Sequence, residues 1–186
     1  MTFFNTFRVQ AYNNAWANYR LLSACEKLSA YELTANRTSF FPSIIETLNH
    51  IITVDWFYVS ALEGTSIGYS AFDPEIPYPD IADLIKEQRI VDRRLIDICE
   101  ELNETSGARP IDIVRETWTQ TERTDRTLLH LFQHQIHHRG QVHAMLSDTN
   151  VMPPQLDEFF LGHEIEQALR SDDFAELKFS ENHIWR

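Results

Sequence analysis

The chain has 186 residues with 16 basic and 28 acidic side chains, and its length suits one domain spanning residues 1–186. The formal net charge of −12 would repel phosphate backbones, so nucleic acid is not an expected partner. Apolar residues make up 43% of the chain, yet no apolar run is long enough to span a bilayer, so no membrane partner is expected. Five glycines are too few for a turn-rich β fold.

The N-terminus and the cysteines favour a reducing compartment. The opening sequence MTFFNTFRVQAYNN lacks the charged and then apolar layout of a signal peptide. Cys25 and Cys99 each lie in an apolar helical pattern, which is typical of small core residues. A disulfide between them is the less favoured alternative. We therefore expect a cytoplasmic protein with two free thiols.

Apolar residues recur at spacings of three and four, which predicts helices. The first is expected over roughly residues 4–28 and the second over roughly residues 39–62. Ser43 and Glu46 form an S-x-x-E box, an N-terminal signal for the second helix. Only Glu46 and Asp55 are charged between residues 40 and 62, and a helix this apolar belongs in the middle of a bundle.

The middle of the chain predicts a loop, a capped helix and an ambiguous stretch. Residues 63–79 contain two glycines and three prolines and are expected to form a loop. Asp80 is expected to cap a third helix over residues 81–102. Residues 103–118 are broken by glycine and proline, and a short extended piece is one alternative there. The third helix carries a bundle-type seam of Ile81, Leu84, Gln88, Val91, Leu95, Ile98 and Leu102.

The last third of the chain predicts one long and one short helix. The long helix is expected over roughly residues 121–147, before the Pro153–Pro154 pair. A shorter helix is expected near residues 156–169, and no segment predicts a convincing strand. The sequence therefore predicts an all-α fold, an antiparallel four-helix bundle with a short accessory helix.

Histidines are concentrated in the string HLFQHQIHHRGQVH. His130, His134 and His138 are spaced by four, so they share one helix face, and neighbouring pairs could bind one metal ion. His130 and His138 are roughly 12 Å apart along the axis, too far to share an ion. The site must therefore use His134 with one of the other two, and His137 is a weaker alternative.

A third ligand must come from another helix, and His50 is the best candidate. It lies in a nearly uncharged helix, where a buried imidazole needs a partner. The helices over residues 39–62 and 121–147 should then be neighbours. The chain contains no HExxH, Glu-x-x-His, CxxC, GxSxG or P-loop motif, which narrows the expected chemistry to a mononuclear site.

Two segments resemble a known family. LLHLFQHQIHHRGQVHAML resembles the signature helix of DinB family proteins, in the DinB/YfiT-like superfamily of candidate metalloenzymes. SIIETLNHIITVDWFYVSALEG is similar to that family's second helix. The resemblance implies a helical bundle, usually a homodimer, with His50, His134 and His138 as ligands of one divalent metal ion. Zinc, nickel, iron and copper all suit imidazole ligands.

Three further residues near the histidines invite interpretation. Gly140 costs helix stability, which suggests close helix packing beside the site. Arg139 could pair with Asp55 behind the ligands, or form an ordinary surface or inter-helix salt bridge. Asp55 itself could support the ligands, hydrogen-bond within the bundle, or bind the metal.

Three functional hypotheses follow. Members of the wider superfamily transfer low-molecular-weight thiols such as bacillithiol, mycothiol or glutathione, so the resemblance implies a metal-dependent thiol transferase acting on a small electrophile. An open three-histidine site, with fewer ligands than structural zinc sites have, agrees with this hypothesis. A stress-response or damage-inducible metal-binding protein without catalysis is the second hypothesis. Metal-dependent hydrolysis is the third, weakened because no acidic general base accompanies the histidine pair.

Overall fold

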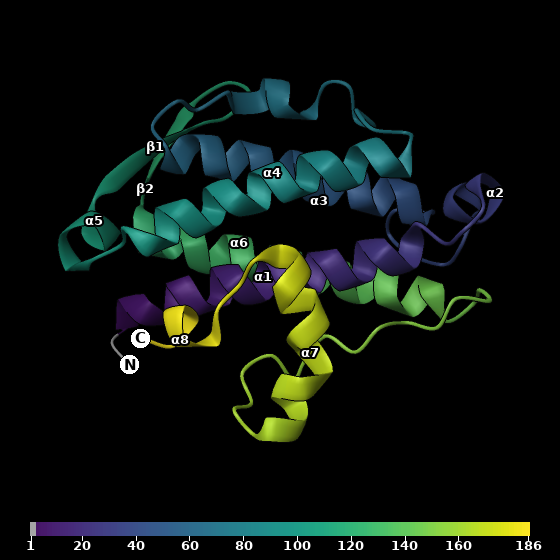
Figure 1. The fold of residues 1–186 in the computed structure, drawn as a ribbon. Helices are drawn as coiled ribbons and strands as arrows, with labels where there is room; N and C mark the ends of the chain where they lie inside the picture. Colours follow the sequence, from purple (N-terminus) through teal and green to yellow (C-terminus); the bar gives the residue numbers. More distant parts are fainter. Residues whose placement is uncertain (1–2) are drawn as a thin grey trace.

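The computed structural model describes residues 3–186, and it is a helical bundle, as predicted. Four long helices lie side by side along most of their length (Figure 1). Each matches one of the four long helices predicted from apolar spacing, with ends that differ by a few residues. They are α1 (Phe3–Cys25), α3 (Ile44–Leu62), α4 (Ile81–Glu100) and α6 (Thr124–Leu146).

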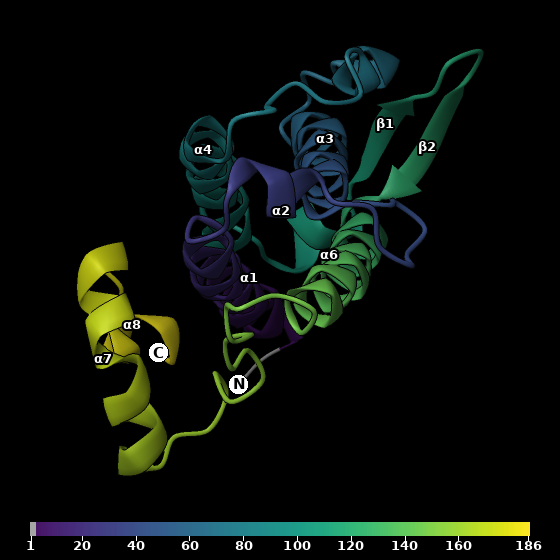
Figure 2. The ribbon, with the colours of Figure 1, turned by 90° about the vertical axis from the view of Figure 1, so that its right-hand side faces the viewer.

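Helices α1 and α6 run in one direction, and α3 and α4 run in the other (Figures 1 and 2). The reason lies in the connection over residues 63–80, which returns along the bundle and includes the 3-10 helix η1 (Gly68–Phe72). Asp80 then caps α4 as predicted, its carboxylate accepting from the Ala82 N–H at 2.8 Å. In this arrangement α3 packs against α6, which is the neighbour relation that the histidine spacing required.

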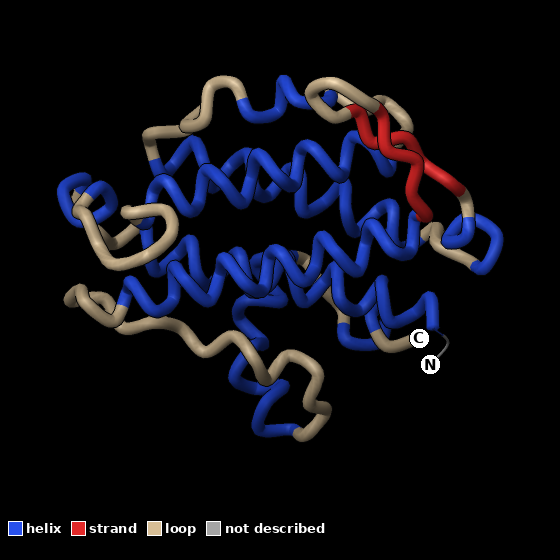
Figure 3. The backbone as a smooth tube through the Cα atoms, turned by 180° about the vertical axis from the view of Figure 1, so that it is seen from behind, coloured by secondary structure: helices blue, strands red, loops and turns tan. Residues whose placement is uncertain are grey.

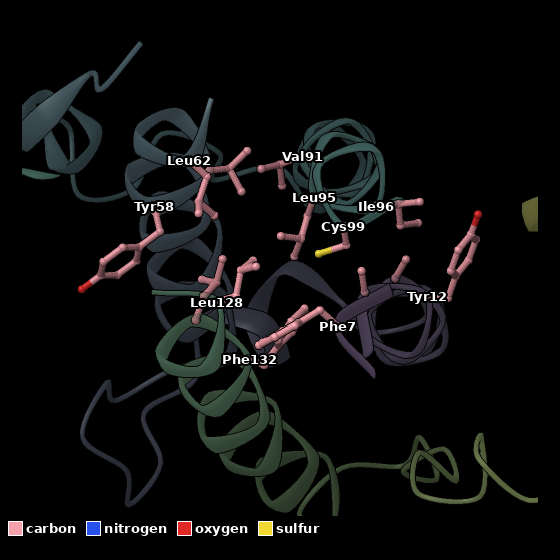
Figure 4. Packing of buried hydrophobic residues seen from close by; sticks show 14 of the residues in the cluster. Phe7, Tyr12, Tyr58, Leu62, Val91, Leu95, Ile96, Cys99, Leu128 and Phe132 are labelled. Atoms are coloured by element: carbon pink, nitrogen blue, oxygen red, sulfur yellow. The ribbon is translucent and has the colours of Figure 1, made fainter. Parts of the chain in front are cut away.

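The apolar core has two clusters, one toward each end of the bundle. Figure 4 shows the larger one, where Phe7 of α1 meets Leu95 of α4 and Leu128 of α6. The smaller cluster includes Leu22 of α1 and Leu146 of α6 at the opposite end. The start of α1 is therefore near the start of α6, which agrees with the parallel course of these two helices.

The second helix begins five residues later than the predicted Ser39. Ser43 is its N-cap, with an extended backbone, and its hydroxyl accepts from the Glu46 N–H at 3.3 Å. The box at Ser43 and Glu46 was therefore the true start signal, because residues before an N-cap are not helical. From Ile44 to Leu62 nearly every side chain of α3 is buried, as its low charge predicted.

No segment was predicted as a convincing strand, which is wrong, but the alternative of a short extended piece within residues 103–118 is confirmed. Strand β1 (Pro110–Val114) pairs antiparallel with β2 (Thr119–Arg123), beside α3 and α6 (Figures 2 and 3). Ile111 and Ile113 are buried at alternate positions, so β1 follows the period of a half-buried strand. The signal is short, and β2 is polar throughout, so neither strand has an apolar run. The short helix α5 (Glu104–Ala108) precedes the hairpin.

The C-terminal region also departs from the prediction. The accessory helix expected at residues 156–169 is α7 (Glu164–Leu177), and residues 153–163 are irregular. Helix α7 lies outside the bundle and packs against α1 (Figure 2). Only Arg170 and Phe174 of α7 are buried, so its apolar pattern was weak. Short helices α2 (Ala30–Thr34) and α8 (Glu181–Ile184) were not predicted.

Both cysteines are free and buried, as expected. Burial raises the pKa of the Cys25 thiol to about 12, and burial also raises the pKa of Cys99. At neutral pH these thiols are therefore protonated and unreactive. Among the helices described over residues 3–186, none combines the length and the apolar character needed to cross a membrane.

Candidate metal centre

Three imidazoles converge where α3 faces α6. His50 comes from α3, and His134 and His138 come from α6, one turn apart. One ring nitrogen from each lies within 4.8 Å of the others, and His50 Nε2 is 3.0 Å from His134 Nε2. We call these three residues the histidine site. The sequence prediction placed the same three residues together.

The remaining histidines of the string do not add a ring nitrogen to this group, although the His137 ring contacts that of His138. The ring of His130 stacks edge-on against Tyr58, with centroids 5.2 Å apart. His137 faces solvent, and its Nε2 is 3.3 Å from Gln141 Nε2. The geometry therefore favours the register of His134 with His138 over the alternatives that include His130 or His137.

The geometry of the histidine site fits one transition-metal ion. Zinc–nitrogen bonds of about 2.0–2.1 Å at tetrahedral angles separate ligand nitrogens by roughly 3.3 Å. The 3.0 Å approach of His50 to His134 is close to that separation. His134 Nδ1 is buried and has no hydrogen-bond partner within the described chain. Among the three rings only His50 and His134 are in hydrogen-bonding contact, and a cation shared by the converging nitrogens would give each ring a partner.

The three imidazoles are held neutral, which is the form that binds metal. Burial, together with the neighbouring His138, lowers the pKa of His50 to about 4. Burial lowers the pKa of His134 to about 3, and nearby His138 and His50 add to the effect. Burial also lowers the pKa of His138. Proton competition for the ring nitrogens is therefore weak near pH 7.

Two residues that the sequence prediction did not single out orient these rings. Gln141 Oε1 lies 2.7 Å from His138 Nδ1, so a proton on Nδ1 leaves Nε2 free as a ligand. The Phe41 ring lies 4.3 Å from the His50 ring and 5.8 Å from the His138 ring, between centroids. Gln141 belongs to the HRGQ string, which is a signal that could have identified it. Phe41 lies outside any helix and gave no periodic signal.

A cavity of about 440 Å³ opens beside the histidine site. His50 lines it together with Phe41, Tyr69 and Phe72, so its walls are largely aromatic. Arg115, from the turn after β1, also lines it. A small molecule in this cavity would lie next to His50. The sequence gave no sign of the cavity, because it forms only when η1 folds back on α3 and the hairpin, much later in the chain, packs beside them.

Comparison with known proteins shows the family and agrees with the fold. The sequence profile of the DinB family matches residues 3–168. This chain belongs to the DinB family. An uncharacterised protein of Bacillus subtilis (strain 168), YizA, is 25% identical over 144 residues, which cover 76% of this chain and 86% of YizA.

A solved structure shows the same fold. The crystal structure of a DinB-like protein from Bacillus cereus ATCC 10987 superposes with a TM-score of 0.58. It is 15% identical in sequence and covers 75% of this chain and 90% of its own. At that identity the likeness supports the helical-bundle fold of this DinB family member and does not extend to its site residues.

Beside the histidine site, this DinB protein has a second cluster of polar side chains in the middle of the bundle. Asp55 accepts hydrogen bonds from Gln88 Nε2 at 2.8 Å and from Gln135 Nε2 at 2.7 Å. Asp92 accepts from Asn14 and Asn18. We call this cluster the polar layer, and it comprises Asn14, Asn18, Asp55, Gln88, Asp92, Gln135 and Arg139.

The polar layer decides between the alternatives for Asp55. Its carboxylate is fully buried and is bonded to Gln88 and Gln135, so it hydrogen-bonds within the bundle and is not part of the histidine group. Burial, with nearby Asp92, raises the pKa of Asp55 to about 7, and burial raises that of Asp92 to about 6. Two buried carboxylates therefore share one compensating cation, Arg139.

At Arg139 and Gly140 the structure differs from what the sequence suggested. Arg139 is buried, and its Nη1 donates to the side-chain oxygens of Asn14 and Asn18, so it forms no direct pair with Asp55. The asparagines connect it to Asp92 instead. Gly140 is exposed, and a Cβ there would meet nothing within 4 Å, so the close packing inferred from it is wrong.

Proposed function

We propose that this DinB protein binds one divalent metal ion at His50, His134 and His138 and uses it to transfer a small thiol to an electrophile. The observation that carries the proposal is the convergence of three neutral imidazoles within 4.8 Å beside a cavity. A cluster with only structural importance would have hydrogen-bond donors for these acceptors. Among the three rings of the described chain, only His50 and His134 are in hydrogen-bonding contact, so no closed hydrogen-bond network holds the group together.

The number of ligands favours chemistry over a structural role. Among the residues that the structure describes, no cysteine or carboxylate joins the three histidines. Structural zinc sites usually have four protein ligands, whereas catalytic sites have three and leave a position for water or substrate. Three neutral ligands also leave the ion's charge uncompensated, so the site would attract an anionic fourth ligand.

A divalent ion held here would lower the pKa of a thiol that binds to it, which supplies the thiolate nucleophile. The protein's own residues do the remaining work. Gln141 fixes the ring of His138, and Phe41 covers one side of His50 and His138. The cavity beside His50 provides room for the electrophile. Imidazole ligands suit zinc, nickel, iron and copper alike.

The proposed transfer conserves atoms and charge. The thiol sulfur forms a bond to an electrophilic carbon of the second substrate, and the bond from that carbon to the leaving group breaks. The leaving group departs with the electron pair, and the thiol proton passes to solvent. No oxidant or reductant is needed. The buried thiols of Cys25 and Cys99 take no part, because they are protonated and enclosed in the core.

Metal analysis of protein purified without an affinity tag would test the first half of the proposal. We expect about one equivalent of divalent metal per chain, and its loss in His138→Ala. His130→Ala is the matched control, because His130 lies on the same helix but outside the histidine group. Light scattering on the same samples would test the homodimer that the family resemblance implies.

Cobalt(II) substitution would test the second half. Sulfur binding to cobalt adds intense charge-transfer bands, so small cellular thiols should produce new bands in the wild type and in His130→Ala but not in His138→Ala. Unchanged spectra with several thiols would favour a metal-binding protein without thiol chemistry. Turnover of esters or amides in the absence of thiol would instead indicate a metal-dependent hydrolase.

A further inference from the structure

Arg115 lines the cavity beside the histidine site. Within the described part of the chain, it is the only arginine or lysine among the lining residues. His50 reaches the cavity from α3, and Arg115 reaches it from the turn between β1 and β2. The chain as a whole carries a net charge of −12, so a cation here is a local departure from the general charge. This position makes Arg115 a candidate for recognising an anionic group.

Arg115 is held in position by its surroundings. Its backbone N–H donates to the Trp118 carbonyl at 2.8 Å, which closes the turn. Its Nε and Nη2 donate to Gln120 Oε1 at 3.2 and 2.9 Å. The guanidinium lies 5.2 Å from the centre of the Phe57 ring and 5.8 Å from that of Tyr58. These contacts orient the planar group before any ligand arrives, which reduces the entropy lost on binding.

The guanidinium of Arg115 has no carboxylate partner within 4 Å in the part of the chain that the structure describes. Its side-chain hydrogen-bond partners are neutral: the Gln120 amide and the Tyr58 hydroxyl. An arginine fixed in this way can form a charge-assisted hydrogen bond with an anionic ligand. Such a bond gains strength in a partly enclosed cavity, where water screens it less.

The other cavity walls define the rest of the ligand. Phe41, Tyr69 and Phe72 provide aromatic surface for an apolar body. Glu46 and Glu75 also line the cavity and would oppose a highly charged ligand. Glu46 accepts from the Ser43 hydroxyl at the start of α3, and Glu75 is exposed. Arg115 can pair with one carboxylate, and the two glutamates disfavour any further negative charge, so the ligand is expected to carry one carboxylate rather than several.

We propose that this cavity binds a small organic molecule with one carboxylate, which pairs with Arg115 while its apolar body lies against the aromatic walls. Its reacting end would then lie beside His50. This inference rests on the proposed function, because it assigns the substrate class of the same site. The carboxylate could belong to the thiol or to the electrophile, and the two arms of the test below distinguish these sources.

The first arm uses cobalt-loaded protein and two series of thiols with matched chain lengths. The ω-mercapto acids carry a carboxylate, and the ω-mercapto alcohols carry a neutral hydroxyl. If the carboxylate belongs to the thiol, the acid should bind about tenfold more tightly than the alcohol at the chain length that spans His50 and Arg115. The preference should fall as sodium chloride is added, because salt screens the pair.

The second arm does not depend on thiol chemistry. Calorimetry with 3-phenylpropionate and its neutral counterpart 3-phenylpropanol measures carboxylate preference in the cavity directly. If the electrophile carries the carboxylate, this preference should appear while the thiol series shows none. If no thiol alters the cobalt spectrum but phenylpropionate is preferred, the proposed function fails and the assignment of the cavity stands. If neither arm shows a preference for the acid, the inference is overturned, and thiol binding alone would leave the proposed function intact.

Variants at Arg115 and Glu75 test whether these residues cause the preference for the acid. Arg115→Gln should abolish it, and Arg115→Lys should restore part of it, because lysine keeps the charge but not the planar fork. Arg126→Gln is the matched control, since Arg126 is exposed on α6 and does not line the cavity. Glu75→Gln should strengthen acid binding, which is a change that damage to the fold cannot produce. Acid preference that survives in Arg115→Gln would contradict the assignment.

Discussion

The histidine site and the polar layer both use adjacent residues of α6, yet they differ in how their side chains are hydrogen-bonded. His134 and His138 face α3, whereas Gln135 and Arg139, each one residue later, face the middle of the bundle. Successive helical residues point about 100° apart, so one segment can serve both regions. Hydrogen bonds between side chains hold the polar layer together, whereas the three rings of the histidine site converge within 4.8 Å with one contact between them, from His50 to His134.

This difference is a physical criterion for separating a ligand site from a structural polar cluster. In the polar layer, both oxygens of Asp55 accept from amide groups, and the oxygens of Asn14 and Asn18 accept from Arg139. Gln135 Oε1 is the exception, as it is buried without a partner. Four substitutions, in order of decreasing effect, test whether the two regions differ in this way.

Removing the cation of the polar layer should have the largest effect. Arg139→Leu leaves Asp55 and Asp92 buried without a compensating charge, so the free energy of unfolding should fall by about 3–5 kcal/mol. Urea denaturation of metal-free protein would measure the loss. The stabilisation gained on adding metal should survive if the variant folds. Arg93→Leu, at an exposed arginine of α4, is the matched control, and an equal loss there would contradict the role of burial.

Removing one imidazole should instead abolish the response to metal. At a metal concentration about a hundredfold above the dissociation constant, binding should stabilise the wild type by about 2.7 kcal/mol. For a chain of this size that corresponds to a rise of roughly 5–10 °C in melting temperature. His134→Ala should lose most of this rise in thermal melts with and without metal.

His183→Ala is the control for the histidine prediction. His183 lies in the C-terminal region, where its Nε2 is 2.7 Å from Glu100 Oε1 and 42% of its side chain is exposed. Its removal should leave the metal response unchanged. Equal responses in wild type and His134→Ala would count against the histidine site.

Removing a titrating carboxylate should change how stability depends on pH. The pKa of Asp55 is raised to about 7, well above its ordinary value near 4, so the native state holds more protons than the unfolded state between these limits. Stability that this group contributes at low pH is therefore lost as pH rises through that window. The advantage of Asp55→Asn over wild type in the free energy of unfolding should therefore grow by about 2–3 kcal/mol from pH 5 to pH 8. Urea melts across this range would show a constant difference if Asp55 does not titrate there.

Adding a methyl group at Gly140, on the surface beside both regions, should have the smallest effect. Gly140 follows Arg139 in sequence and is exposed, and a side-chain Cβ at this position would have no neighbour within 4 Å. Gly140→Ala should therefore raise the free energy of unfolding by about 0.5–1 kcal/mol, because alanine favours the helix. A loss of stability in chemical denaturation would show that the glycine is needed for close approach after all.

The features that could be predicted from the sequence are those that depend on residues close together in the chain. Apolar spacing predicted α1, α3, α4 and α6, because a buried stripe on a helix repeats every three or four residues. The caps at Ser43 and Asp80 depend only on the next few residues. His134 and His138 share a face because they are one turn apart, and His50 was identified by its uncharged helix and by the family resemblance.

Tertiary structure alone decided what depends on residues far apart in the chain. Arg139 was expected near a carboxylate, yet its direct partners are Asn14 and Asn18, more than a hundred positions away. The hairpin was missed because its buried face consists of Ile111 and Ile113, too few residues to show a period. Spacing within one segment reports which face a side chain is on, whereas packing between segments decides what that face meets. The polar layer and the cavity at Arg115 arise from such packing, so no single stretch of sequence contains either.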